Sequence, residues 1–239
     1  MTLAHVNIVF QIVVLLFAVS LHESAHAWMA WRLGDPTARM LGRITLNPIK
    51  HIDPVGSIVV PIITGFMGYT FGWAKPTPVN TRYFKHIVRD DIMTSVAGPL
   101  SNFLLAIVAV VALKIIAVSS VTGTVAVSDS LAFIFAPGQT HGFQTNSSLN
   151  AIAVLLCDAV FVNVILGIFN LIPIPPLDGS HAVRHLLPSG AVRIYDQMGM
   201  IGLLLIFIVG GRVLWFLAVP VLQLFFSPLP THVVLMGGS

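Results

Sequence analysis

The sequence has few charged residues, a single glutamate and a single cysteine. Charged side chains make up 9% of the 239 residues, whereas hydrophobic ones make up 56%, and the mean hydropathy is +0.92. Apolar runs long enough to cross a bilayer as helices recur along the chain. This composition excludes an ordinary soluble domain. The lone Cys157 excludes an internal disulfide bond, and the net charge of +3 reflects basic loops and gives no nucleic-acid signal.

Four apolar runs are predicted to span the membrane. They cover about residues 6–31, 92–118, 149–172 and 198–226. Two glycines and an arginine interrupt the last run, so both one helix and two helices remain open for it. Because Leu, Ile, Val and Phe dominate without polar alternation, helices are favoured over transmembrane strands. The sequence therefore predicts an all-α polytopic membrane protein that forms one membrane-embedded domain over residues 1–239.

The segment 55–73 is also apolar, but a proline and four glycines interrupt it. Basic loops tend to stay on the cytoplasmic side of a membrane. If this segment dips into the bilayer and returns, as a re-entrant piece or a β-hairpin, ten of the twelve Lys and Arg residues fall on one side. We therefore predict that it dips rather than spans, and that the N-terminus lies outside. Short strands are expected around residues 38–46.

The motif LHESAHAW at residues 21–28 lies inside the first predicted span. His22 and His26 are four positions apart, so on a helix both imidazoles share a face and can reach one metal ion. Glu23 is the only glutamate of the chain, and a carboxylate inside a membrane helix is costly unless it has a partner or a task. HExxH spacing is typical of zinc sites in which the glutamate deprotonates water. A polar patch that merely joins helices is the simpler alternative.

A third metal ligand is expected, because catalytic zinc sites use about three protein ligands and leave one position open. Asp178 fits best, since it lies in the proline-rich segment 170–181, at the end of the third clear span. If residues 55–73 dip and return, this carboxylate arrives on the same side of the membrane as the two histidines. An ordinary Asp-Gly turn is the simpler alternative. The reserve candidates are His181, His51 and Asp158.

Several motifs together resemble those of the site-2 protease family of intramembrane zinc metalloproteases. The resemblance covers about residues 6–190, without an insertion long enough for a PDZ domain or an extension for a pair of CBS domains, as in small prokaryotic members. The matching segments are HESAH at 22–26, NPIKHIDPVG at 47–56, GWAKPTPVN at 72–80, AGPLSN at 97–102 and NLIPIPPLDG at 170–179.

The resemblance implies a three-helix catalytic core that binds one zinc ion per chain. By this resemblance, His22, His26 and Asp178 would be the zinc ligands, and Glu23 would be the general base. The C-terminal apolar run would add one or two helices outside this core.

The resemblance further implies that Asn170 and Asn102 hold substrate or stabilise the oxyanion. Hydrogen bonds between helices are the alternative for both. The predicted function is hydrolysis of peptide bonds within or near transmembrane helices, in regulated intramembrane proteolysis. The partners would be a membrane-protein helix and the lipid bilayer, and no nucleic acid. The predicted location is the inner cell membrane, with the active site toward the cytoplasm.

A zinc transporter is the alternative function, because intramembrane His and carboxylate groups also mark ion pathways. The predicted ligands gather at one end of the bundle, whereas a permeation path needs several groups across its depth. A non-catalytic homologue is a third possibility, against which the presence of Glu23 argues.

Overall fold

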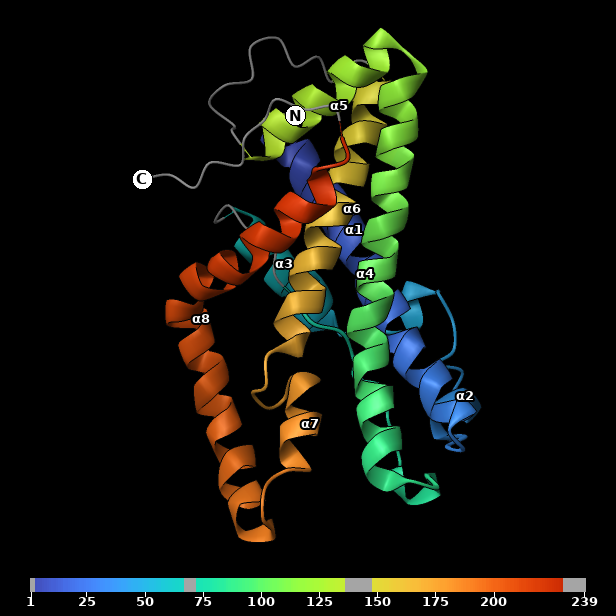
Figure 1. Cartoon of the computed structure of the whole chain (residues 1–239), viewed down its shortest axis with the longest axis vertical. Helices are drawn as coiled ribbons and strands as arrows, with labels where there is room; N and C mark the ends of the chain where they lie inside the picture. Colours follow the sequence, from blue (N-terminus) through green and yellow to red (C-terminus); the bar gives the residue numbers. More distant parts are fainter. Residues whose placement is uncertain (1–2, 67–71, 136–147, 230–239) are drawn as a thin grey trace.

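The protein is built from helices throughout the part that is described. The computed structural model describes residues 3–66, 72–135 and 148–229, in which no strand occurs. This confirms the predicted all-α class. The helices are α1 (Leu3–Arg32), α2 (Thr37–Met40), η1 (Pro48–Lys50), η2 (Pro54–Val59), α3 (Val60–Phe66), η3 (Thr81–Tyr83), α4 (Ile87–Ser119), α5 (Val121–Phe135), α6 (Ser148–Leu171), α7 (Gly179–Arg184) and α8 (Ser189–Phe226) (Figure 1).

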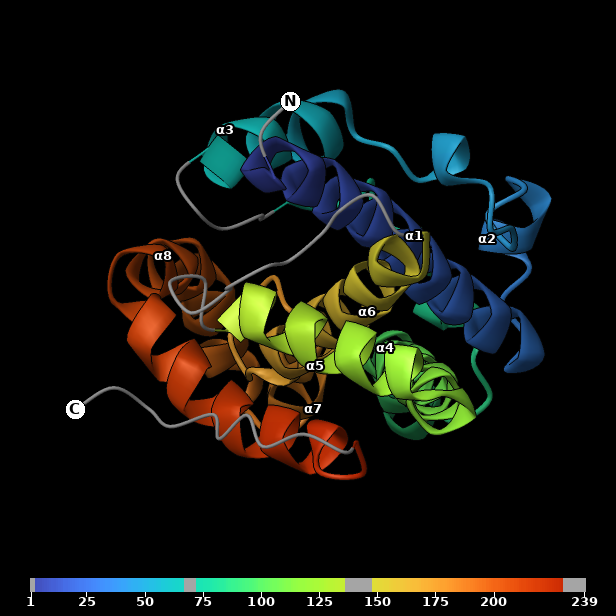
Figure 2. The same cartoon turned by 90° about the horizontal axis from the view of Figure 1, so that it is seen from above.

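Three helices of the described part are long and apolar enough to cross a membrane. They are Ile8–Arg32 within α1, the whole of α4 and the whole of α6. Each pair of these helices is in contact, and Figure 2 shows α1, α6 and α4 gathered side by side when the bundle is seen from above. The three clear spans expected from the sequence therefore correspond to helices, although α4 begins at Ile87 rather than near residue 92.

The apolar core lies mainly between α4, α5, α6 and α8. On α4, Ala106, Ala109 and Leu113 are almost completely shielded, and Val160 and Val164 face them from α6. Small alanine side chains allow the helix backbones to approach closely, which favours packing where lipid provides no hydrophobic driving force. Packing in this layer therefore fixes α6, and with it the direction in which the chain leaves α6.

The expected strands around residues 38–46 do not form. Residues 37–40 make the short helix α2 instead. The carboxylate of Asp35 explains the turn into it, because Oδ1 accepts the N–H of Thr37 at 2.9 Å and Oδ2 accepts the N–H of Asn80 at 2.7 Å. A side chain that bonds the backbone two residues on favours a turn over an extended strand.

The β-hairpin alternative for residues 55–73 is also wrong for the described part of that segment. The chain is helical through η2 and α3 as far as residue 66, and residues 67–71 lie outside the described part. Asp53 caps the helix start, since its Oδ1 accepts the N–H groups of Val55 at 3.1 Å and Gly56 at 2.7 Å. Helix α3 packs against both η2 and α1. The entry of η2 and α3 into the membrane remains a prediction.

Helix α5 was not expected, because the sequence from 119 to 150 was interpreted as a connection between spans. At 15 residues this helix is shorter than a bilayer crossing. Its start is capped by Ser120, whose Oγ accepts the N–H of Gly123 at 3.0 Å. A Cβ atom at Gly123 would lie 2.0 Å from the carbonyl oxygen of Ile116, so only glycine permits this tight reversal after α4.

The C-terminal apolar run belongs to one continuous helix, α8, of 38 residues. Figure 1 shows that it changes direction midway along its length. This answers the question of one helix or two in favour of one bent helix, which starts at Ser189 rather than near residue 198. The side chains of residues 200–213, and therefore that of Arg212, lie outside the described part.

Candidate metal centre

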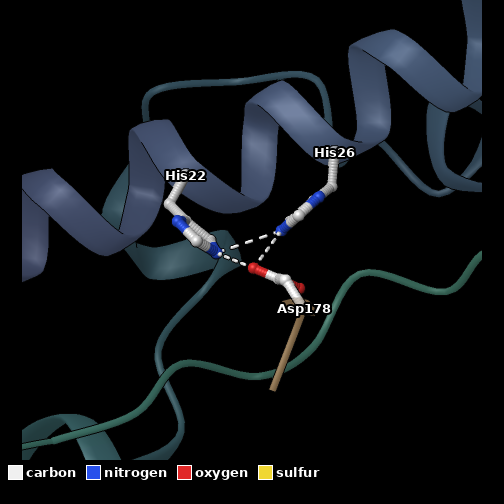
Figure 3. A group of neighbouring side chains, drawn as sticks. All are labelled: His22, His26 and Asp178. Carbon is white, nitrogen blue, oxygen red and sulfur yellow. Dashed lines mark hydrogen bonds and ion pairs between the residues drawn. The ribbon is translucent and has the colours of Figure 1, made fainter. Parts of the chain in front are cut away.

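Two histidines and an aspartate from distant parts of the chain meet at the C-terminal half of α1 (Figure 3). Nε2 of His22 and Nε2 of His26 are 3.0 Å apart, and they lie 3.1 Å and 3.3 Å from Oδ2 of Asp178. Three tetrahedral ligands about 2.0–2.1 Å from a zinc ion are roughly 3.3 Å from one another. The three atoms therefore have the spacing that one zinc ion requires.

The three atoms that would bind the metal also lack the hydrogen-bond partners that they would need in its absence. Oδ2 of Asp178 is buried without a hydrogen-bond partner in the described part of the chain. The two Nε2 atoms face each other across 3.0 Å, a gap with room for one hydrogen at most. A cation between His22, His26 and Asp178 satisfies all three atoms at once. The residues present thus fit a zinc ion, and topology brings Asp178 to the histidines as predicted.

Asp178 stays ionised in this position. Burial alone would raise its pKa, but the electrostatic attraction of the neighbouring His26 holds the pKa well below its ordinary value. A deprotonated carboxylate is the form that binds a metal. The LDG glycine contributes sterically, because a Cβ atom at Gly179 would lie 2.2 Å from the carbonyl oxygen of Leu171. The chain can therefore fold back onto the end of α6 directly after Asp178.

The Nδ1 atom of each histidine is bonded to an oxygen that can only accept. Nδ1 of His22 donates to Oδ1 of Asn102 at 2.6 Å, and Nδ1 of His26 donates to the carbonyl oxygen of Thr94 at 2.7 Å. Both acceptors belong to α4. Because these bonds place the hydrogen on Nδ1, Nε2 of each ring is left with a free lone pair for a metal.

Asn102 lies at the junction of the three long helices. It is 0% exposed, and its Nδ2 donates to Oδ1 of Asn163 on α6 at 2.9 Å and to the carbonyl oxygen of Ala18 on α1 at 3.3 Å. These bonds favour the alternative of hydrogen bonds between helices for Asn102, which also orients His22, and its expected role toward substrate stays a prediction. Asn170 does not join this network, since its Nδ2 donates to the carbonyl oxygen of Leu166 in its own helix at 3.0 Å.

Gly98, in the AGP motif of α4, lies against both histidines. A Cβ atom at this position would be 2.3 Å from Nε2 of His26 and 2.7 Å from Cε1 of His22. No side chain fits in that space, so the glycine allows α4 to pass directly beside the metal ligands. Gly98 was not predicted as a site residue, although it lies in the AGPLSN motif at residues 97–102.

The carboxylate of Glu23 is held by the connection that precedes α4. The N–H of Thr77 donates to Oε2 of Glu23 at 2.7 Å, and the hydroxyl of Thr77 donates to the carbonyl oxygen of Glu23 at 3.0 Å. Thr77 lies in the GWAKPTPVN segment at 72–80. The segment had been recognised as a motif, but nothing in its composition predicted this contact across 54 positions of sequence.

The three reserve ligands lie elsewhere. Nε2 of His51 bonds the carbonyl oxygen of Thr45 at 2.9 Å, and the buried Asp158 has Gln11 of α1 at 3.5 Å. His181 pairs with Asp91 of α4 at 3.0 Å, and this hydrogen bond raises the pKa of His181 above its ordinary value. Within the described residues, the trio of His22, His26 and Asp178 is the group whose ligand atoms converge for a metal.

Residues 10–209 match peptidase family M50. The chain belongs to this family. The M50 chain is 34% identical over 211 residues to YwhC of Bacillus subtilis, named as a zinc metalloprotease, and the match covers 86% of this chain and 84% of YwhC. It is 28% identical over 233 residues to Rip2 of Mycolicibacterium smegmatis, also named as a zinc metalloprotease, covering 94% and 76% of the two chains. No solved structure matches the chain.

Rip2 of Mycobacterium tuberculosis is a third similar protein, 26% identical over 216 residues that cover 85% of this chain and 68% of Rip2. Its printed name again describes a zinc metalloprotease. M50 membership confirms the resemblance to site-2 proteases that the motifs indicated. The family, the relatives and the three apolar helices support a membrane zinc protease.

Proposed function

We propose that this M50 protein hydrolyses peptide bonds within or near the transmembrane helices of other membrane proteins, as an enzyme of regulated intramembrane proteolysis. One observation carries the proposal. The Nε2 atoms of the two buried histidines lie within 3.3 Å of Oδ2 of Asp178. Both histidines belong to α1, which is long enough to cross a membrane, and a glutamate lies between them in the same helix. A metal site with a neighbouring base, built inside a membrane helix, suits the cleavage of chains that are themselves in the membrane.

In this mechanism, His22, His26 and Asp178 would hold one zinc ion, with the atoms Nε2, Nε2 and Oδ2 that lie together. When bound, zinc supplies a Lewis acid that polarises a peptide carbonyl and acidifies a water molecule. Glu23 accepts a proton from the attacking water and then delivers it to the nitrogen of the leaving amine. The N–H of Thr77 on Oε2 keeps the Glu23 carboxylate in one position for both transfers.

The substrate must unwind before it can react. Inside a bilayer, the backbone groups of a helical substrate are bonded to one another and are shielded from attack. Asn170, at the end of α6 and half-buried, is proposed to contact the unwound chain. Basic residues lie at the C-terminal end of α1 and in the segment after it, from Arg32 to Lys50. Their charge supports the proposal that this end of α1 and the cleavage site face the cytoplasm of an inner-membrane protein.

The test is the variant Glu23→Gln, purified and reconstituted with a reporter protein that carries one transmembrane helix. We expect about one zinc per chain to be retained, because three protein ligands remain, and cleavage of the reporter to be lost. Undiminished cleavage by this variant overturns the assignment of the general base. Zinc uptake by vesicles that contain the wild-type protein, without any cleavage, would favour the transporter instead.

A further inference from the structure

Near the start of α4, one carboxylate oxygen of Asp91 forms hydrogen bonds with the imidazole rings of two histidines. Oδ2 of Asp91 lies 3.0 Å from Nδ1 of His181 and 2.7 Å from Nε2 of His185. His181 is in α7 and His185 is the residue that follows α7, so the two histidines are four positions apart and share one helix face. Asp91 itself is 5% exposed. A buried carboxylate with two donors is a specific junction between α4 and α7.

The helix that Asp91 holds is the one that begins at the candidate metal ligand. Asp178 is the N-cap residue of α7, and its carbonyl oxygen accepts the N–H of His181 at 3.1 Å. A helix of six residues is not stable by itself, so its position depends on contacts with the rest of the protein. Any force that moves α7 relative to α4 therefore moves the backbone that carries Asp178.

Few polar contacts fix α7 in the described part of the chain. The two side-chain hydrogen bonds that join it to α4, from His181 and His185, are both accepted by Oδ2 of Asp91. On the other side, Arg184 pairs with Asp196 of α8 at 2.9 Å, but both side chains are well exposed, and exposed ion pairs contribute little. The buried junction on Asp91 is accordingly the stronger of the two.

We propose that Asp91 is a positioning residue of the metal centre. Its carboxylate holds His181 and His185, and through them fixes α7 so that Asp178 is presented to the same point as the α1 histidines. Asp91 does not contact the metal or the substrate. The inference rests on the proposed function only in taking Asp178 as a ligand. It adds Asp91 to the residues that position the metal ligands, although Asp91 is not bonded to a ligand directly.

The experiment measures zinc affinity in the purified full-length chain by competition with a chelator. It also records the visible spectrum of the cobalt-loaded protein, which reports the coordination geometry. Loss of a residue that orients a ligand typically weakens metal binding by roughly 10- to 100-fold. We expect a loss of that size for Asp91→Ala, together with a cobalt spectrum shifted toward that of Asp178→Ala.

Two carboxylates serve as matched controls. Asp90 is adjacent in α4 and equally buried, but it bonds Arg89 and the N–H of His86 rather than α7. Asp196 is the exposed partner of α7 on its other side. Asp90→Asn and Asp196→Asn should leave the zinc affinity within a factor of about two of the wild type. A loss in Asp90→Asn as large as that in Asp91→Ala would overturn the proposal in favour of a general defect of α4.

The histidine side of the junction provides an independent test should Asp91→Ala fail to fold. In His185→Gln the amide nitrogen can take the place of Nε2, whereas His185→Leu has no donor. We expect zinc affinity to be kept in the first variant and to fall in the second. Wild-type affinity and an unchanged cobalt spectrum in both Asp91→Ala and His185→Leu would refute the positioning role. Unchanged zinc affinity in Asp178→Ala would instead refute the ligand assignment in the proposed function.

Discussion

Gly98 of α4 lies so close to His26 of α1 that a single added carbon would reach the ring, since a Cβ atom at Gly98 would be 2.3 Å from Nε2. The pair shows that the metal centre depends on how closely two long helices pass each other. The nitrogen concerned is the one that points toward Asp178. A change of packing at this crossing is therefore also a change at the ligands.

The variant Gly98→Ala is expected to bind zinc at least about 10-fold more weakly, because the new methyl group must displace His26 or push α4 away from α1. Chelator competition measures the affinity, and circular dichroism checks that the helices remain. Gly190→Ala is the matched control, since nothing lies within 4 Å of a Cβ atom at Gly190 in α8. Equal zinc affinities in the two variants would contradict the argument.

Asn102→Leu is expected to weaken zinc binding by roughly 10- to 100-fold, because Nδ1 of His22 loses its acceptor and the ring is no longer held in the form with a free Nε2. Asn163→Leu should have a smaller effect, since Asn102 keeps its bond to Ala18. Zinc titration of both variants and the wild type gives the ranking. An effect of Asn163→Leu that exceeds that of Asn102→Leu would show that the α6 residue matters for another reason.

Thr77→Val removes the hydroxyl bond to the carbonyl oxygen of Glu23 but keeps the backbone N–H on its carboxylate. A hydrogen bond of this kind contributes about 1 kcal/mol, which corresponds to a loss of roughly fivefold in kcat. The zinc content should be unchanged, because the substitution does not alter the metal ligands. KM should also be unchanged, because the lost hydrogen bond is made to Glu23 and not to the substrate. Thr77→Ser, which keeps the hydroxyl, should restore kcat. A loss that serine does not restore, or that appears in KM, would argue against a role in holding the base.

Removal of zinc with a chelator should lower the thermal stability of the wild-type protein in detergent. A ligand that binds only the folded state at roughly 100 times its Kd adds about 2.7 kcal/mol of stability. In Asp178→Ala, the difference in Tm between loaded and chelated samples should shrink strongly, since the site has lost its carboxylate. A full zinc-dependent shift in that variant would mean that the ion is held elsewhere.

The sequence predicted the parts of this structure that depend on local periodicity. The spacing of four residues places His22 and His26 on one face of α1, whatever the position of that helix in the fold. The long apolar runs predicted α1, α4 and α6. The position of Asp178 was predicted from the distribution of basic residues, which indicates the side of the membrane on which a distant segment arrives. These inferences used patterns that hold before any tertiary contact is known.

Contacts between distant segments could not be predicted in this way. The bond from His185 to Asp91 joins residues 94 positions apart, and its existence depends on how α7 packs against α4. Helix α5 was missed because it is too short to give the signal of a membrane span. The turn at Asp35 was missed because its second carboxylate oxygen is satisfied by Asn80, on a segment 45 positions away.

The meeting of α1 with the end of α6 has a consequence for the order in which the protein matures. Synthesis delivers His22 and His26 with the first span, whereas Asp178 follows only after the third. A nascent chain that ends before Asp178 therefore carries two of the three candidate ligands, His22 and His26. The complete set of three candidate ligands therefore exists only once α6 and the residues that follow it have been made.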